Sequence, residues 1–155
     1  MFYEELKGDL FTAEFKIPSE AYRYVQCISA DCKCGAGIAV EFNKYFNVRD
    51  RIPYGLRYAR QMGSHIMKML PCPSIYDTIP VINLITKERY YNKPTYKTME
   101  QVFGMLRSWC DETGIKDLYL PKIASGLDGL KWAKVTNRLQ WAFRDSNINL
   151  HVFYL

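Results

Sequence analysis

Two charged side chains stand where a nucleophile and its assisting group could act. Lys87 follows 80–85, a near-continuous apolar run typical of a buried central strand. A lysine at the rim of such a strand loses hydration, which favours the neutral, nucleophilic amine. Asp128 lies between Gly126 and Gly129, in a loop where the backbone can approach a ligand closely. The ordinary alternatives are a solvated lysine and an Asx-type turn residue.

The two groups would also constrain each other. A carboxylate beside the lysine opposes its activation, because the carboxylate favours the ammonium form. If Lys87 and Asp128 lie close together, useful chemistry therefore requires a proton to pass between them or to a substrate oxygen.

A glycine-bearing loop between a predicted strand and a predicted helix is suited to an anion. The chain from Ser29 begins as a polar loop, narrows at Gly35-Ala36-Gly37 and continues from Ile38 to Phe46 with apolar residues at helical spacing. Backbone N–H groups and the positive end of the helix would then point at one place, as a phosphate or pyrophosphate requires. Gly-Ala-Gly is not the dinucleotide fingerprint, and such turns also serve as plain connections.

Residues near the two ends of the chain could bind a base. Asp9, directly after Gly8, could accept a hydrogen bond from an exocyclic amine such as adenine N6, or it could cap the following turn. Phe11 and Phe153 could sandwich a base, although either aromatic side chain also suits the core.

The elements that must position these residues alternate along the chain. Strands are predicted at 1–6, 22–28, 118–123 and 150–154, and 64–70 is predicted to pair with 78–85 as a hairpin around 71–73. Helices are predicted at 36–46 and 54–61, from Pro94-Thr95 to Gly114, and over 132–143. This alternation predicts a three-layer α/β domain spanning 1–155. The glycine-rich and polar segments follow strands, so they could share one crevice.

Composition narrows the class of protein. The chain has 155 residues, of which 48% are hydrophobic, and no run is long enough to span a membrane. Acidic residues follow Met1 where a signal peptide would carry Lys or Arg, so we expect an intracellular protein, cytoplasmic or nuclear.

The five cysteines match no common zinc spacing, so no metal site is expected. The net charge of +5 fits nucleotides, nucleic acid and plain solubility alike. The basic region 49–68 fits a solvated face better than a nucleic-acid surface.

A set of motifs in fixed order resembles a known family. The motifs are Gly8-Asp9-Leu10, Ser29-Ala30-Asp31-Cys32, Gly35-Ala36-Gly37-Ile38-Ala39, Leu84-Ile85-Thr86-Lys87, Lys93-Pro94-Thr95-Tyr96, Pro121-Lys122-Ile123 and Gly126-Leu127-Asp128-Gly129-Leu130. Together they resemble a macrodomain over essentially the whole chain, in the stand-alone branch typified by terminal ADP-ribose protein glycohydrolase. Ala124-Ser125 and Cys34 depart from the residues expected in that branch.

The resemblance implies a three-layer α/β/α fold with a central mixed sheet and a pocket for ADP-ribose. Asp9 would bind the adenine amine, Phe153 would flank the adenine, and the 35–39 and 125–127 segments would hold the diphosphate. Lys87 would attack the anomeric carbon of the distal ribose, assisted by Asp128. The ligand-binding residues expected from the resemblance are Asp9, Leu10, Ser29, Gly35, Ala36, Gly37, Ile38, Ala39, Ser125, Gly126, Leu127 and Phe153.

The implied activity is removal of ADP-ribose from acidic side chains, or deacylation of O-acyl-ADP-ribose, by a monomeric enzyme without a cofactor or a membrane partner. The positive charge that develops on the sugar could be stabilised by the adjacent carboxylate. Two alternatives remain: a reader that binds ADP-ribose without turnover, and a de-ADP-ribosylase acting on DNA. The leaving group could be a glutamyl protein, acetate, phosphate or a nucleobase.

Overall fold

The computed structural model describes residues 1–12, 19–52 and 70–155, which form one six-stranded sheet. The strands are β1 (Phe2–Lys7), β2 (Tyr22–Ser29), β3 (Ser74–Asp77), β4 (Val81–Lys87), β5 (Asp117–Pro121) and β6 (Asn149–Tyr154). Their order across the sheet is β1-β6-β5-β2-β4-β3. All neighbouring strands are parallel except β3 and β4, so the sheet is mixed, as predicted.

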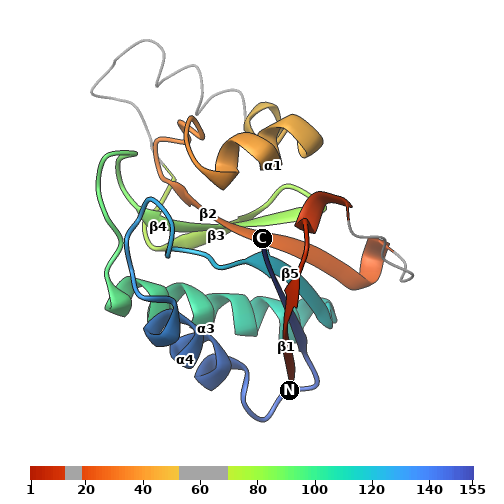
Figure 1. Cartoon of the computed structure of the whole chain (residues 1–155). Coiled ribbons are helices and arrows are strands. Elements are labelled where there is room, and N and C mark those ends of the chain that lie inside the picture. Colours follow the sequence, from red (N-terminus) through yellow and green to blue (C-terminus); the bar gives the residue numbers. More distant parts are fainter. Residues whose placement is uncertain (13–18, 53–69) are drawn as a thin grey trace.

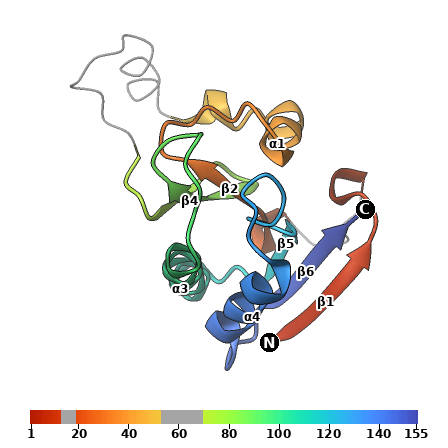
Figure 2. The same cartoon turned by 60° about the vertical axis from the view of Figure 1, so that its left-hand side comes forward.

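Helices cover both faces of this sheet. Helix α1 (Ile38–Phe46) lies on one face, and α3 (Tyr96–Thr113) and α4 (Trp132–Phe143) lie on the other (Figures 1 and 2). Three one-turn 3₁₀ helices, η1 (Leu10–Thr12), η2 (Ser19–Ala21) and η3 (Arg49–Arg51), complete the described elements. None of the described helices has the length and apolar character needed to cross a membrane. The three layers confirm the predicted α/β/α architecture.

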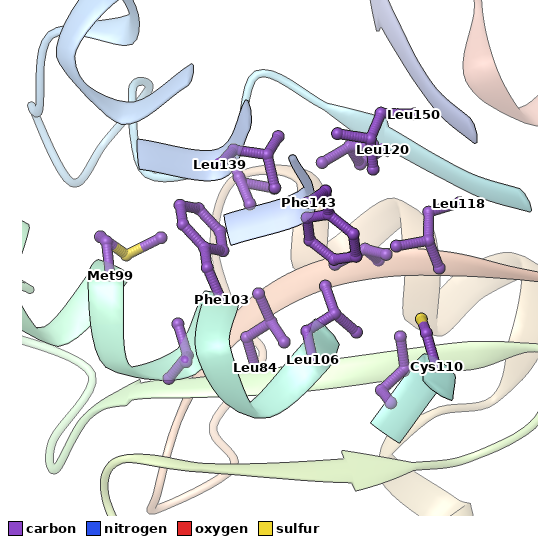
Figure 3. Packing of buried hydrophobic residues seen from close by; sticks show 14 of the residues in the cluster. Leu84, Met99, Phe103, Leu106, Cys110, Leu118, Leu120, Leu139, Phe143 and Leu150 are labelled. Atoms are coloured by element: carbon purple, nitrogen blue, oxygen red, sulfur yellow. The ribbon is translucent and has the colours of Figure 1, made fainter. Parts of the chain in front are cut away.

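The layers are joined by two apolar clusters. Between the sheet and α3 and α4, fully buried side chains interdigitate, among them Leu84, Phe103 and Leu139 (Figure 3). On the opposite face, Phe42 of α1 is fully buried against Tyr24 of β2. Burial of such side chains contributes roughly 1.5–3 kcal/mol each. The core therefore fixes the strands whose carboxyl ends carry the candidate site.

The boundaries of α3 follow directly from its capping residues. The Thr95 side chain accepts a hydrogen bond from the Thr98 backbone N–H at 3.1 Å, which satisfies one of the free donors of the first turn. Gly114 ends the helix in the left-handed region, at φ 79°. The helix predicted between Pro94-Thr95 and Gly114 is confirmed.

The predicted hairpin requires a correction. The antiparallel neighbour of β4 is β3, with Ser74 opposite Ile85 and Asp77 opposite Ile82. The N–H and hydroxyl of Thr78 both donate to the Val81 carbonyl, at 2.8 and 2.9 Å. Residues 78–80 therefore form the turn instead of the start of the strand. The predicted helix 54–61 and all but Leu70 of the predicted strand 64–70 lie outside the described residues.

Candidate active site

The structure brings together the two residues expected to do chemistry. Lys87 is the last residue of β4, and Asp128 lies in the loop that follows β5. The Lys87 Nζ is 2.7 Å from the Asp128 Oδ1, and each side chain is only 15% exposed. An amine and a carboxylate at hydrogen-bond distance can exchange a proton directly. The pair therefore has the geometry of a nucleophile with an adjacent proton acceptor.

An irregularity in β2 holds the backbone beside this pair. The register between β2 and β4 shifts between Ile28 and Ser29, so Ser29 lies opposite Lys87. The Ala30 N–H then donates to the Lys87 carbonyl at 2.8 Å. Bulges of this kind commonly re-aim side chains next to functional sites. Here the irregularity lies at the end of β2, at Ser29, which is the residue opposite Lys87.

Asp31 joins the chain after β2 to the chain after β4. It is 4% exposed and accepts hydrogen bonds from the Ser29 hydroxyl and, at 2.9 Å, from the Tyr90 backbone N–H. A buried carboxylate with charge-assisted bonds of this kind stabilises the loops that it connects. In the sequence Asp31 stands inside the Ser29-Ala30-Asp31-Cys32 motif, and it is not among the predicted site residues. Its partner Tyr90 is distant in sequence, so only the fold shows the link.

A cavity of about 880 Å³ lies above the carboxyl ends of β2, β4 and β5. Ligands in open α/β sheets bind at this edge. The lining residues are Cys27, Ile28, Ser29, Lys33, Cys34, Gly35, Ala36, Gly37, Ile38, Ala39, Lys87, Tyr90, Lys93, Pro121, Lys122, Ile123, Ala124, Gly126, Leu127 and Asp128. Among the described residues, no group of three or more His, Cys, Asp or Glu side chains could hold a metal ion.

One wall of the cavity is the start of α1. Gly37 is the N-cap residue, with φ 62° and ψ −150°, a conformation essentially restricted to glycine. No side chain caps this helix end. The first backbone N–H groups of α1 therefore have no side-chain acceptor, and they lie at the cavity wall. N–H groups at a helix start can bind an anionic ligand.

The opposite wall is the loop that carries Asp128. The loop closes through hydrogen bonds from Gly129 N–H to the Gly126 carbonyl (3.0 Å) and from Leu130 N–H to the Ala124 carbonyl (2.9 Å). The Lys93 ammonium donates to the Leu127 carbonyl, which joins this loop to the segment before α3. Figures 1 and 2 show these two segments close to each other. The backbone around Asp128 is thus held on two sides.

Cys27 lies in the same cavity but is not suited to act as a thiolate. Burial raises the pKa of its thiol well above the ordinary range, and the charge of Asp128 raises this pKa further, while Lys87 lowers it. At neutral pH the thiol is therefore protonated. Among the groups that meet here, the amine of Lys87 is the better candidate nucleophile.

The residues expected from the resemblance divide into two groups. Lys87, Asp128, Ser29, Gly126, Leu127 and the whole 35–39 segment line the cavity. Asp9, Leu10, Ser125 and Phe153 are not among the lining residues. The Asp9 carboxylate accepts a hydrogen bond from the Phe11 N–H at 2.9 Å, as in the alternative in which it caps a turn. The ligand-binding roles of all these residues stay predictions.

Several lining residues were not expected to contact a ligand. They are Cys27, Ile28, Lys33, Cys34, Tyr90, Lys93, Pro121, Lys122, Ile123 and Ala124. Lys33 and Cys34 lie inside the polar loop, and Lys93 directly precedes the helix-starting Pro94, so their positions after strands were a usable signal. Tyr90 offered none, because an exposed aromatic residue in a turn has no local pattern.

Comparison with known proteins decides the family. The chain is 35% identical to human ADP-ribose glycohydrolase OARD1 over 150 residues. These residues cover 97% of this chain and 90% of that protein. This chain belongs to the macrodomain family. The bovine OARD1 protein is 33% identical to this macrodomain over the same length. No protein-family model matches the chain.

Solved macrodomain structures share the fold of this macrodomain. The macrodomain of Mycobacterium tuberculosis DarG superposes with a TM-score of 0.77 at 19% identity, covering 99% of this chain and 98% of that one. The macrodomain of Thermus aquaticus DarG gives 0.75 at 20% identity, covering 99% of both chains. Thermosipho africanus DarTG, solved in complex with ADP-ribose, gives 0.73 at 16% identity, covering 98% of this chain and 41% of that one. At these identities the likeness concerns the fold alone.

Proposed function

We propose that this macrodomain is a hydrolase that binds ADP-ribose and releases it from acidic side chains, or deacylates O-acyl-ADP-ribose. The observation that carries this proposal is the Lys87–Asp128 pair at 2.7 Å inside the cavity. The relationship to a protein named ADP-ribose glycohydrolase gives the substrate class. No cofactor enters the proposal.

The chemistry follows from the two groups and the ester. Lys87 gives its ammonium proton to Asp128, and the resulting amine attacks the anomeric carbon of the distal ribose. The bond to the ester oxygen breaks with its electron pair leaving on the carboxylate, which takes the proton from Asp128. Asp128, ionised again, stabilises the positive charge of the covalent intermediate on the sugar. A water molecule then attacks the same carbon and gives a proton to Asp128, while the bond to the Lys87 nitrogen breaks with its electron pair returning to the nitrogen. Asp128 finally returns the proton to the Lys87 amine. The net reaction is hydrolysis.

The cavity walls give the substrate its orientation. The start of α1, which has no side-chain cap, would hold the diphosphate, because helix N-termini bind phosphate through free N–H groups and the helix dipole. The distal ribose would then lie towards Lys87, and an acyl ester on that same sugar would lie beside the same two groups. Held in this way, the substrate reacts as in an intramolecular step.

A reader without turnover would require only the cavity. The low exposure of both Lys87 and Asp128 favours the enzyme, because a buried pair has a desolvation cost that binding alone does not explain. The test is to replace Lys87 by Ala and Asp128 by Asn and to measure ADP-ribose affinity by calorimetry alongside turnover. We expect affinity to stay within about threefold while turnover falls by about 100-fold or more, since an interaction made at the reacting carbon is removed.

The matched control is Lys97→Ala, which removes an exposed lysine of α3. This control should leave both measurements unchanged. The substrates should be a glutamyl-ADP-ribosylated protein, O-acetyl-ADP-ribose and ADP-ribosylated DNA, so that the preferred leaving group is identified in the same assay. Full turnover in Lys87→Ala would remove the lysine from the mechanism, and wild-type binding without turnover on any substrate would favour the reader.

A further inference from the structure

The segment directly after Lys87 exposes two aromatic side chains beside the cavity. Tyr90 is 59% and Tyr91 is 67% exposed, and their rings contact each other with centroids 5.3 Å apart. Tyr90 also lines the cavity that contains Lys87 and Asp128. Exposed aromatic pairs of this kind are uncommon and mark interaction surfaces more often than isolated apolar residues do.

Hydrogen bonds hold the backbone of the turn that carries this aromatic pair. The Tyr90 N–H donates to the buried Asp31 carboxylate at 2.9 Å. In the same turn, the Arg89 N–H donates to the Asn92 side chain at 2.9 Å, and the Asn92 N–H donates to the Arg89 carbonyl at 3.0 Å. A surface that is ordered before binding loses less entropy when a partner binds.

The surroundings of the pair are positively charged. The Lys33 ammonium is 5.9 Å from the centroid of the Tyr90 ring, and both Arg89 and Lys93 are exposed. We call Lys33, Arg89, Tyr90, Tyr91 and Lys93 the rim patch. Glu88 is the one acidic residue in the segment 88–93. The rim patch therefore combines three cations with two aromatic rings.

We propose that the rim patch binds acidic side chains that flank the modified residue in the polypeptide that carries the ADP-ribose group. This inference rests on the proposed function. The leaving group is attached to the carbon that faces Lys87, and Arg89 of the rim patch is two residues along the chain from that lysine. Acidic side chains of the polypeptide on both sides of the modified residue would then form ion pairs with Lys33 and Arg89.

The charge pattern favours an acidic peptide over a nucleic acid. A strand of nucleic acid follows a continuous basic groove with a cation for each of several phosphates. The rim patch offers three cations clustered around one mouth of the cavity, and the Lys93 ammonium is already bonded to the Leu127 carbonyl. This arrangement suits the few carboxylates of a short peptide.

The first experiment measures binding without turnover. In the Lys87→Ala variant, an acidic peptide that carries ADP-ribose on glutamate should bind about tenfold more tightly than free ADP-ribose. Arg89→Ser and Tyr91→Ser, whose residues do not line the cavity, should abolish this advantage and leave the affinity for free ADP-ribose unchanged. The advantage should also weaken as salt is raised, because exposed charges are screened. Equal affinity for the peptide and for free ADP-ribose would overturn the inference.

The second experiment uses the active protein. Arg89→Ser and Tyr91→Ser should lower kcat/KM about five- to tenfold on the peptide ester and leave O-acetyl-ADP-ribose hydrolysis unchanged. The matched control is Arg144→Ser with Trp141→Ser, since Arg144 lies 3.7 Å over the exposed Trp141 ring on α4. Equal losses on both substrates, or a loss confined to ADP-ribosylated DNA, would overturn the inference. Absence of hydrolysis in the wild type contradicts the proposed function instead, and the binding experiment still decides on the rim patch.

Discussion

The charged groups of the site depend on one another. Lys87 and Asp128 form the pair that would do the chemistry, and Asp31 holds the backbone on the other side of Lys87 through Ser29 and Tyr90. These carboxylates therefore have separate tasks. Asp128 faces the Lys87 amine, while the oxygens of Asp31 are used by hydrogen bonds within the protein.

Replacing Asp31 by Ala should lower both stability and turnover. The change leaves the Ser29 hydroxyl and the Tyr90 N–H without their acceptor, which costs about 1–3 kcal/mol in a buried site. Because the segment after β4 loses its anchor, kcat should fall while the affinity for free ADP-ribose changes little. Thermal unfolding and steady-state kinetics measure the two effects. A variant with normal unfolding and normal kcat would show that this carboxylate positions nothing.

Sequence patterns predicted that Lys87 and Asp128 carry the chemistry, because each residue follows a strand that is recognisable from its apolar run, and the structure brings the two side chains together. They could not locate Asp31 or Tyr90 as partners. That contact joins two turns with no local periodicity, and it exists only because β2 and β4 are neighbours in the sheet. Long-range contacts between irregular segments are the part of a site that a pattern cannot predict.

At the scale of elements, the loop at the start of α1 and the loop after β5 meet across the cavity. A Cβ atom on Gly37 would lie 3.3 Å from the Leu127 Cδ1, a close contact. Gly37 also has a backbone conformation that other residues rarely adopt. The close approach of these two walls, with no side chain at this position, leaves the N–H groups of the helix start accessible.

Gly37→Ala should therefore weaken ADP-ribose binding as well as the fold. The backbone conformation costs about 1–3 kcal/mol for a residue with a Cβ, and the chain would relax by moving the start of α1. We expect the affinity for ADP-ribose, measured by calorimetry, to fall about tenfold or more. Gly104→Ala is the matched control, because Gly104 lies on α3 outside the cavity lining and a Cβ there would meet nothing within 4 Å. Equal effects of the two substitutions would argue against this role for Gly37.

Elements were predictable where local signals agree. Thr95 and Gly114 mark the ends of α3, and the apolar run in β4 marks a buried strand. The short strand β3 was missed because its residues are all partly exposed and show no alternation. Its place at the edge of the sheet comes from pairing with β4, which is a tertiary contact.

At the scale of the whole molecule, burial keeps several weak acids protonated to a higher pH than in the unfolded chain. Burial raises the pKa of the Tyr24 hydroxyl, the Tyr119 hydroxyl and the Cys110 thiol to about 12 in each case. Tyr24 and Tyr119 belong to the cluster under α1, and Cys110 belongs to the cluster under α3 and α4. Groups that must stay protonated in the folded protein therefore lie on both faces of the sheet, so we expect alkaline pH to destabilise the whole fold.

The free energy of unfolding should fall progressively above about pH 9. In the unfolded chain a cysteine ionises near ~8.5 and a tyrosine near ~10, whereas these groups stay protonated in the folded protein until about pH 12. The unfolded state thus binds fewer protons over this range, so stability is complete below the unfolded pKa values and is lost as the pH rises. Each group contributes at most about 1.4 kcal/mol per pH unit.

Calorimetric Tm values from pH 7 to 11 measure this loss of stability. The Cys110→Val variant should lose less stability between about pH 8.5 and 10 than the wild type. A Tm that is constant to pH 11, or a Cys110→Val profile parallel to that of the wild type, would contradict the assignment of this loss to buried protonated groups.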